Sequence, residues 1–109
     1  MYSFYHLCKF KIFQIYKDNM LNLLIAECIG TFVFFTCILN ASDPIPIAIG
    51  LLAAIYMFGK ISGGHFNSTV SFLMLMKGDI DFTKFLAYVL AQSFGALLAL
   101  SLWKFINNS

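Results

Sequence analysis

Two long apolar segments constrain this chain more than any other feature of its sequence. Residues 21–39 and residues 85–103 each run for nineteen residues, and the only charged side chain inside them is Glu27. A helix of that length crosses the hydrocarbon core of a bilayer, which is about 30 Å thick. Hydrophobic residues make up 61% of the 109 residues and charged residues 11%, which leaves too little polar surface for a water-soluble domain. The sequence therefore predicts an all-α membrane protein.

The apolar pattern predicts three membrane-spanning helices and one shorter helix. The spans cover about residues 21–40, 45–61 and 84–104, and the short second span lengthens if Lys60 reaches toward the headgroups. A glycine-rich polar stretch separates the second and third spans and precedes residues 67–76, a helix candidate about 15 Å long, half the thickness of a bilayer. Two interpretations remain open: a re-entrant half-helix, or a cytoplasmic loop with a helix on the membrane surface.

The distribution of lysine favours re-entry and gives an orientation. If the middle segment returns to the side that it left, six lysines lie on that side and only Lys104 lies on the other. The positive-inside rule then places the N-terminus in the cytoplasm and the C-terminus outside. The six lysines are Lys9, Lys11, Lys17, Lys60, Lys77 and Lys84.

The two ends of the chain differ in composition from the apolar middle. Aromatic and lysine residues alternate over residues 1–20, a pattern typical of a segment that lies in the headgroup region. Met20 directly precedes the first span, so translation starts either at Met1 or at Met20. Residues 105–109 form a short C-terminal tail.

Several function classes are excluded. A net charge of +2 is too weak and too scattered for nucleic-acid binding. No nucleophile or acid stands at catalytic spacing from His65, and no ligand cluster would hold a metal, so we expect neither an enzyme nor a cofactor. Cys28 and Cys37 are about 13 Å apart along one predicted helix, which makes them packing residues rather than a disulfide.

Small residues recur at four-residue spacing in every predicted span. In lipid there is little hydrophobic force between helices, and small side chains let backbones approach closely. We therefore expect a tight helix bundle. The sets are Ala26 and Gly30, Gly50 and Ala54, and Ala91, Gly95 and Ala99.

Glu27 is an acidic side chain inside the first span. At that depth a carboxylate is costly unless it faces the bundle and finds hydrogen-bond donors. Three roles are open: acceptor for the backbone N–H groups of an irregular loop, proton relay, and packing without further function. We favour loop support, because the chain has no second titratable group at that depth.

Three motifs, taken in order, resemble the N-terminal half of the major intrinsic protein family, which comprises the aquaporins and glycerol facilitators. The motifs are the run from Ala26 to Phe32, the run from Ser62 to Asn67, and Tyr88 followed by Ala91, Gln92 and Gly95. The resemblance covers about residues 21–104. It implies one aquaporin-like inverted-repeat half, with three spans and one re-entrant half-helix over residues 67–76.

The resemblance also implies roles for individual residues. Asn67 starts the half-helix and directs its amide toward the pore, followed by Ser68 and Thr69. Backbone carbonyls of the preceding residues form a row of acceptors. Ile47 matches a position in the outer selectivity filter, and Glu27 and Gln92 brace the loop. The carbonyls belong to Gly63, Gly64 and His65.

Two departures from the family pattern affect the expected function. The family's Asn-Pro-Ala motif reads Asn67-Ser68-Thr69 here, and the second half is absent from these 109 residues. The resemblance implies a channel subunit in the lipid bilayer for passive transport of water or small neutral solutes such as glycerol. Its pore would need a complementary second half or a homo-oligomer, and the lysine asymmetry opposes an upside-down copy. The alternative is a truncated, non-conducting membrane protein with a structural or partner-binding role.

Overall fold

The chain folds as an all-α membrane protein, as predicted from its composition. The computed structural model describes the backbone of residues 2–108 and the side chains of residues 20–108. The described residues form four helices: α1 (Tyr2–Asn40), α2 (Pro44–Ser62), α3 (Ser68–Lys77) and α4 (Phe82–Asn107). Three described stretches are long and apolar enough to cross a membrane: Met20–Asn40, Pro44–Ser62 and Phe82–Asn107. The interfacial segment predicted over residues 1–20 lies, apart from Met20, outside the residues whose side chains are described.

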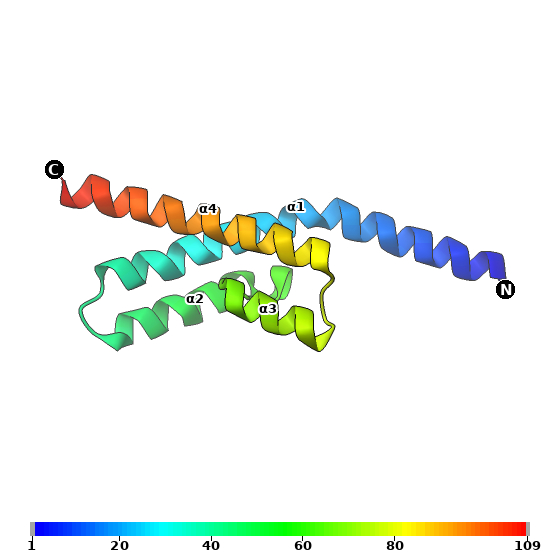
Figure 1. Ribbon diagram of the computed structural model, residues 1–109, viewed down its shortest axis with the longest axis horizontal. Helices are drawn as coiled ribbons and strands as arrows, with labels where there is room; N and C mark the ends of the chain where they lie inside the picture. Colours follow the sequence, from blue (N-terminus) through cyan, green and yellow to red (C-terminus); the bar gives the residue numbers. More distant parts are fainter. Residues whose placement is uncertain (1, 109) are drawn as a thin grey trace.

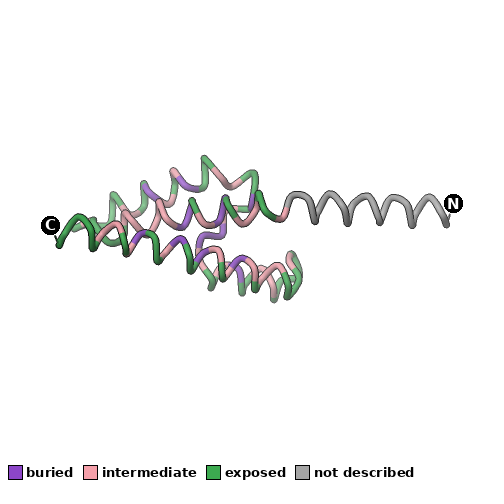
Figure 2. The backbone as a smooth tube through the Cα atoms, turned by 90° about the horizontal axis from the view of Figure 1, so that it is seen from above, coloured by how far each residue is buried: buried purple, intermediate pink, exposed green. Residues whose placement is uncertain are grey.

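Helix α1 is the centre of the arrangement. It packs against both α2 and α4, and α3 packs against α4. Figure 1 shows that α1 and α4 run in the same direction and that α2 runs in the opposite direction. Helix α3 begins beside the middle of α4 and ends beside its start (Figure 1). Buried positions occur on each of the four helices and in the loop before α3 (Figure 2).

The helices begin and end at residues that satisfy their free backbone groups. The Asp43 carboxylate caps α2 by accepting the Ile45 N–H at 2.9 Å, and Pro44 occupies a first-turn position that needs no N–H. Helix α2 ends at Gly63, whose φ of 93° is left-handed and whose N–H donates to the Gly59 carbonyl at 2.8 Å. The chain can therefore leave the helix sharply and enter the loop.

Helices α3 and α4 are capped in the same way. The Asn67 side chain accepts the Thr69 N–H at 2.8 Å and starts α3. A left-handed Gly78 ends it, and the Asp81 carboxylate then accepts the Lys84 N–H at 2.8 Å to start α4. Helix α3 is thus ten residues long, or about 15 Å.

Glycine allows two close helix contacts. A Cβ on Gly95 would overlap the backbone carbonyl of Cys28, so α4 and α1 touch backbone to backbone at this point. A Cβ on Gly50 would lie 2.5 Å from Cys37 Sγ, so this glycine of α2 receives a side chain of α1. Of the seven small residues singled out in the sequence, six are buried and one is half-buried. The buried ones are Ala26, Gly30, Gly50, Ala54, Gly95 and Ala99, and the half-buried one is Ala91.

Gly30 was expected to contact another helix, but it contacts the loop between α2 and α3 instead. A Cβ on Gly30 would overlap the ring of Phe66, which belongs to the loop between α2 and α3. The Phe66 side chain is fully buried. The gap over Gly30 therefore holds the loop against α1 rather than a second helix.

Candidate functional site

The segment between α2 and α3 turns back on itself through left-handed backbone conformations. Gly63 and Gly64 have φ values of 93° and 70°, and Phe66 has a φ of 52°. Glycine adopts such angles without strain, whereas a side chain such as that of Phe66 costs about 1 to 3 kcal/mol there. Burial of its ring over Gly30 and a hydrogen bond from its N–H to Glu27 offset that cost.

Glu27 is the acceptor around which the loop is organised. It is fully buried on α1, and its carboxylate accepts three hydrogen bonds. Oε2 accepts the Ser62 hydroxyl at 2.8 Å, and Oε1 accepts the Phe66 N–H at 3.1 Å and the Gln92 Nε2 at 2.8 Å. The donors come from the end of α2, the loop and α4, so one carboxylate joins α1 to the other three segments.

Ser62 and Tyr88 hold the first part of the loop. The Ser62 hydroxyl oxygen accepts the Gly64 N–H at 3.3 Å while it donates to Glu27. The Tyr88 hydroxyl donates to the Ser62 carbonyl at 2.6 Å, and Tyr88 is fully buried. The end of α2 is therefore tied to α4 as well as to α1.

A second branch of the network runs from Gln92 to the other side of the loop. Gln92 Nε2 also lies 3.0 Å from Ser71 Oγ on α3, and Ser71 Oγ lies 2.8 Å from His65 Nδ1. Ser71 is fully buried and His65 is 9% exposed. The edge of the His65 ring packs on Tyr88, with 5.0 Å between ring centroids. Both sides of the loop are thus fixed to α4 by buried polar contacts.

The start of α3 presents hydrogen-bond donors. Asn67 uses its Oδ1 to cap the helix, which leaves the two protons of its Nδ2 as donors. The first N–H groups of a helix also carry a partial positive charge, about half an elementary charge in total. A cavity of about 110 Å³ lies at this point. It is lined by Phe35, Asn67, Ser68, Gln92, Ser93 and Ala96.

Comparison with known proteins decides which family has this arrangement. The family described as Major intrinsic protein matches residues 14–109. The chain belongs to the major intrinsic protein family. The resemblance found in the sequence is thereby confirmed. Because this match joins three helices that are long and apolar enough to span a membrane, the chain is a multi-pass integral membrane protein.

Curated relatives in the major intrinsic protein family are longer than this chain. A protein named glycerol uptake facilitator protein-like 6, from Lactiplantibacillus plantarum, is 37% identical over 84 residues, which covers 69% of this chain and 39% of the relative. An aquaporin Z from Brucella melitensis is 40% identical over 95 residues, which covers 73% of this chain and 42% of the relative. The chain thus spans about two fifths of the length of these two relatives. No solved structure matches the chain.

One residue that the sequence analysis placed along the pore, Ile47, lies apart from the others. Gly63, Gly64, His65 and Asn67 follow one another in the loop, but Ile47 lies one turn after the start of α2. Ile55, which lies beside Gly64 of the loop, stands eight residues further along that helix, about 12 Å along the axis. Ile47 is half-buried. It therefore belongs to a different level of the protein from the loop.

Four residues of this site were given no individual role in the sequence analysis, although three of them stand inside its motifs: Ser62, Phe66, Ser71 and Tyr88. Spacing contained a signal for two of them. Tyr88 stands four residues before Gln92 on α4, and Ser71 stands four residues after Asn67, so each shares a helix face with a residue that was singled out. The left-handed backbone of Phe66 had no sequence signal, because large side chains rarely adopt it.

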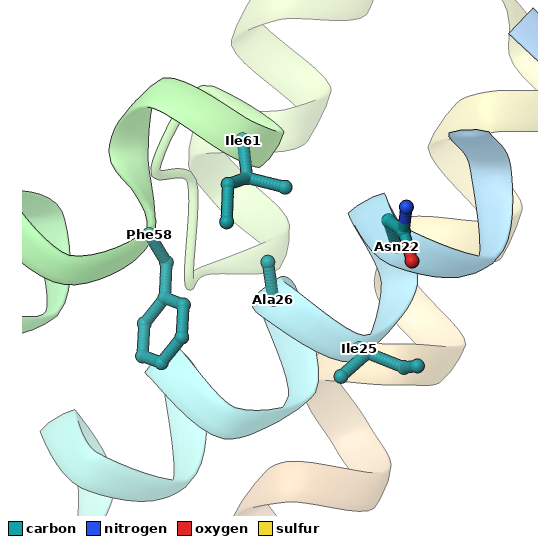
Figure 3. Close-up of a pocket in the computed structure, with 5 residues that line it drawn as sticks. All are labelled: Asn22, Ile25, Ala26, Phe58 and Ile61. Carbon is teal, nitrogen blue, oxygen red and sulfur yellow. The ribbon is translucent and has the colours of Figure 1, made fainter. Parts of the chain in front are cut away.

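A second cavity lies in the crevice between α1 and α2. It has a volume of about 270 Å³ and is lined by Asn22, Ile25, Ala26, Phe58 and Ile61. Figure 3 shows that its lining comes from one face of α1 and the last turns of α2. Asn22 supplies the only polar side chain of this lining. Over the described residues, no group of three or more His, Cys, Asp or Glu could hold a metal ion.

Proposed function

We propose that this chain is one half of a membrane channel for water or small uncharged solutes such as glycerol. The proposed process is passive passage along a gradient, without catalysis. The pore forms when a complementary second half covers the open side of the re-entrant loop. The observation that carries the proposal is the half-length helix α3, whose donor-rich start is held beside the middle of α4 by a buried hydrogen-bond network.

The position of α3 supports re-entry. Its ten residues reach about 15 Å, which is half of a bilayer core. Its first residues share a cavity with Gln92 and Ser93, which stand near the middle of the 26-residue α4. Irregular backbone at such a depth is tolerated where it is enclosed by protein or lines a wet cavity. The Glu27 network encloses one side of the loop, and the other side is available to a pore.

The chemistry of the α3 start suits an uncharged solute. Asn67 offers N–H donors, and Ser68 and Thr69 add hydroxyl groups at exposed positions. Such groups can replace hydrogen bonds that water or a polyol loses on leaving bulk water. The positive end of the α3 dipole opposes cations. We assign the row of carbonyl acceptors to Gly63, Gly64 and His65, and an outer filter position to Ile47.

The open side of α3 supports the need for a second half. Within the described residues α4 is the helix that contacts α3. Phe72, Leu73 and Met76 of α3 are exposed. The matched segment covers 39% and 42% of the two relatives named above, which leaves room in each for a second half. We assign the N-terminus to the cytoplasm from the lysine asymmetry, which favours a distinct second half over an inverted copy of this chain.

The experiment is an osmotic flux measurement on liposomes that contain this chain with a complementary half from a full-length relative. Asn67→Asp is the decisive variant. Aspartate is also a good helix cap, so α3 keeps its start, but the variant loses both amide donors and places a negative charge there. We expect osmotic volume change above protein-free liposomes for the wild type, and none above background for Asn67→Asp.

Ser101→Ala is the matched control, because the Ser101 hydroxyl is exposed on α4 and bonds its own helix at Leu97. It should retain full flux. Equal flux from Asn67→Asp and the wild type would overturn the proposed role of the α3 start. No flux in any pairing, with insertion confirmed, would favour the non-conducting alternative.

A further inference from the structure

A series of buried hydrogen bonds links Glu27 to His65 through Gln92 and Ser71. The donor and the acceptor of each bond can be worked out from its neighbours. Gln92 Nε2 lies 2.8 Å from Glu27 Oε1 and 3.0 Å from Ser71 Oγ. Turning the amide over would place its oxygen against the Glu27 carboxylate, so the nitrogen must face both partners. One amide proton therefore goes to Glu27 and the other goes to Ser71.

The Ser71 hydroxyl then has one free proton and one suitable neighbour. Its oxygen accepts from Gln92, and His65 Nδ1 lies 2.8 Å away. A hydroxyl carries a single proton, which this geometry directs to Nδ1. When the hydroxyl gives that proton to Nδ1, Nδ1 is the unprotonated acceptor. The neutral imidazole of His65 carries its proton on Nε2.

We propose that Ser71 is a positioning residue: its hydroxyl passes the orientation of Gln92 on to His65, selects the Nε2–H tautomer and holds residue 65 in the re-entrant loop. Tyr88 cannot make this selection. Its ring contacts the imidazole edge at a centroid distance of 5.0 Å and restrains the ring plane, but an aromatic contact does not choose between the two ring nitrogens.

The consequence for transport rests on the proposed channel function. The carbonyl of His65 is one of the three loop acceptors proposed to line the pore. A side chain anchored at one end by Ser71 fixes the backbone to which that carbonyl belongs. The peptide group of that carbonyl is also held by the hydrogen bond from the Phe66 N–H to Glu27, so loss of the Ser71 anchor removes one of two polar restraints on the His65 carbonyl.

The first test measures the tautomer of His65 directly. Nitrogen NMR of labelled protein in bilayers distinguishes a protonated from an unprotonated ring nitrogen. The chain has two histidines, so a His6→Gln background leaves His65 as the only signal. We expect an unprotonated Nδ1 in this background. Ser71→Ala should lower the ratio of the Nε2–H to the Nδ1–H tautomer about tenfold, the equilibrium effect of one hydrogen bond near the upper end of its usual net strength.

Two further variants separate the hydroxyl from side-chain size. Ser71→Thr keeps the hydroxyl and should restore the tautomer ratio. Ser71→Cys has nearly the size of serine but is a weak donor, and it should resemble Ser71→Ala. Ser101→Ala should change nothing. A tautomer ratio that is the same in the wild type and Ser71→Ala would overturn the proposal.

The second test asks whether Ser71 acts through His65. In the paired channel, Ser71→Ala should reduce flux several-fold, and it should have no further effect when His65 is already Ala. Effects that multiply in the double variant would contradict the positioning role. If the wild-type channel shows no flux, the proposed function fails, and the tautomer measurement still decides the role of Ser71.

Discussion

Replacing Glu27 by methionine and by glutamine separates the volume of this side chain from its hydrogen bonds. Methionine has a similar length and no hydrogen-bonding group of comparable strength. In Glu27→Met the Ser62 hydroxyl can turn to the Phe58 carbonyl, which is 3.5 Å away. The Phe66 N–H and one proton of Gln92 lose their acceptor while they remain buried. Each orphaned donor costs about 1 to 3 kcal/mol, so the expected loss of stability is about 2 to 6 kcal/mol.

Glutamine at position 27 keeps most of the pattern. Its Oε1 can accept the Phe66 N–H and the Gln92 amide. Its Nε2 then faces the Ser62 oxygen, whose own proton turns to Phe58. The change replaces charge-assisted hydrogen bonds by neutral ones, and we expect a loss of about 1 kcal/mol.

The assay is reversible unfolding in mixed micelles, followed by the fluorescence of Trp103, the only tryptophan of the chain. The free energy of unfolding should fall in the order wild type, Glu27→Gln, Glu27→Met. A methionine variant as stable as the glutamine variant would refute the argument that Glu27 holds the loop by accepting its donors.

Three further changes test the packing around the loop. Gly30→Ala places a methyl group where the Phe66 ring lies, and should lower the free energy of unfolding in the same assay by about 1 to 3 kcal/mol. Gly95→Ala meets the backbone carbonyl of Cys28, which cannot turn away, and should separate α1 from α4 with at least as large a loss in that assay. Tyr88→Phe removes one hydrogen bond to the end of α2 and should cost about 1 kcal/mol, with faster amide hydrogen exchange at the loop.

Gly59→Ala is the matched control for the two glycine substitutions. Gly59 also lies in a helix, but the nearest atom to a new Cβ is the side-chain Cγ2 of Ile55 at 3.3 Å. A flexible side chain can move by a few tenths of an ångström, and alanine favours a helix by about 1 kcal/mol over glycine. This variant should be neutral or stabilising. A loss as large as that of Gly30→Ala would show that any added methyl group disturbs the bundle.

The all-α class with three long apolar helices could be predicted because it depends on local signals. Apolar length sets the spans, and Asp43, Asn67 and Asp81 stand where helix caps are expected. The singled-out polar residues Glu27 and Gln92 proved to be hydrogen-bonded to each other. Depth identified Glu27, since buried polar groups in lipid need partners, and the family resemblance identified Gln92.

The interior of the loop could not be predicted in the same way. The position of Phe66 over Gly30 depends on a left-handed backbone angle that no residue pattern indicates. The hydrogen bond between Ser71 and His65 joins a residue of α3 to a residue of the loop. The distance between these two residues depends on how the chain turns at Gly63 and Gly64. Long-range geometry of this kind follows from packing, so sequence spacing gives only candidate residues.

Helix α3 is proposed to start in the middle of the membrane, and the depth of its first residues can be measured. Spin labels at Thr69, Ser93 and Ser42, each in a cysteine-free background in bilayers, report depth through their relative exposure to oxygen and to a water-soluble nickel complex. All three positions are exposed on the protein surface. Ser93 marks the middle of α4, and Ser42 marks the turn between α1 and α2. We expect Thr69 to lie as deep as Ser93, and a Thr69 label as shallow as the label at Ser42 would show that α3 does not enter the membrane.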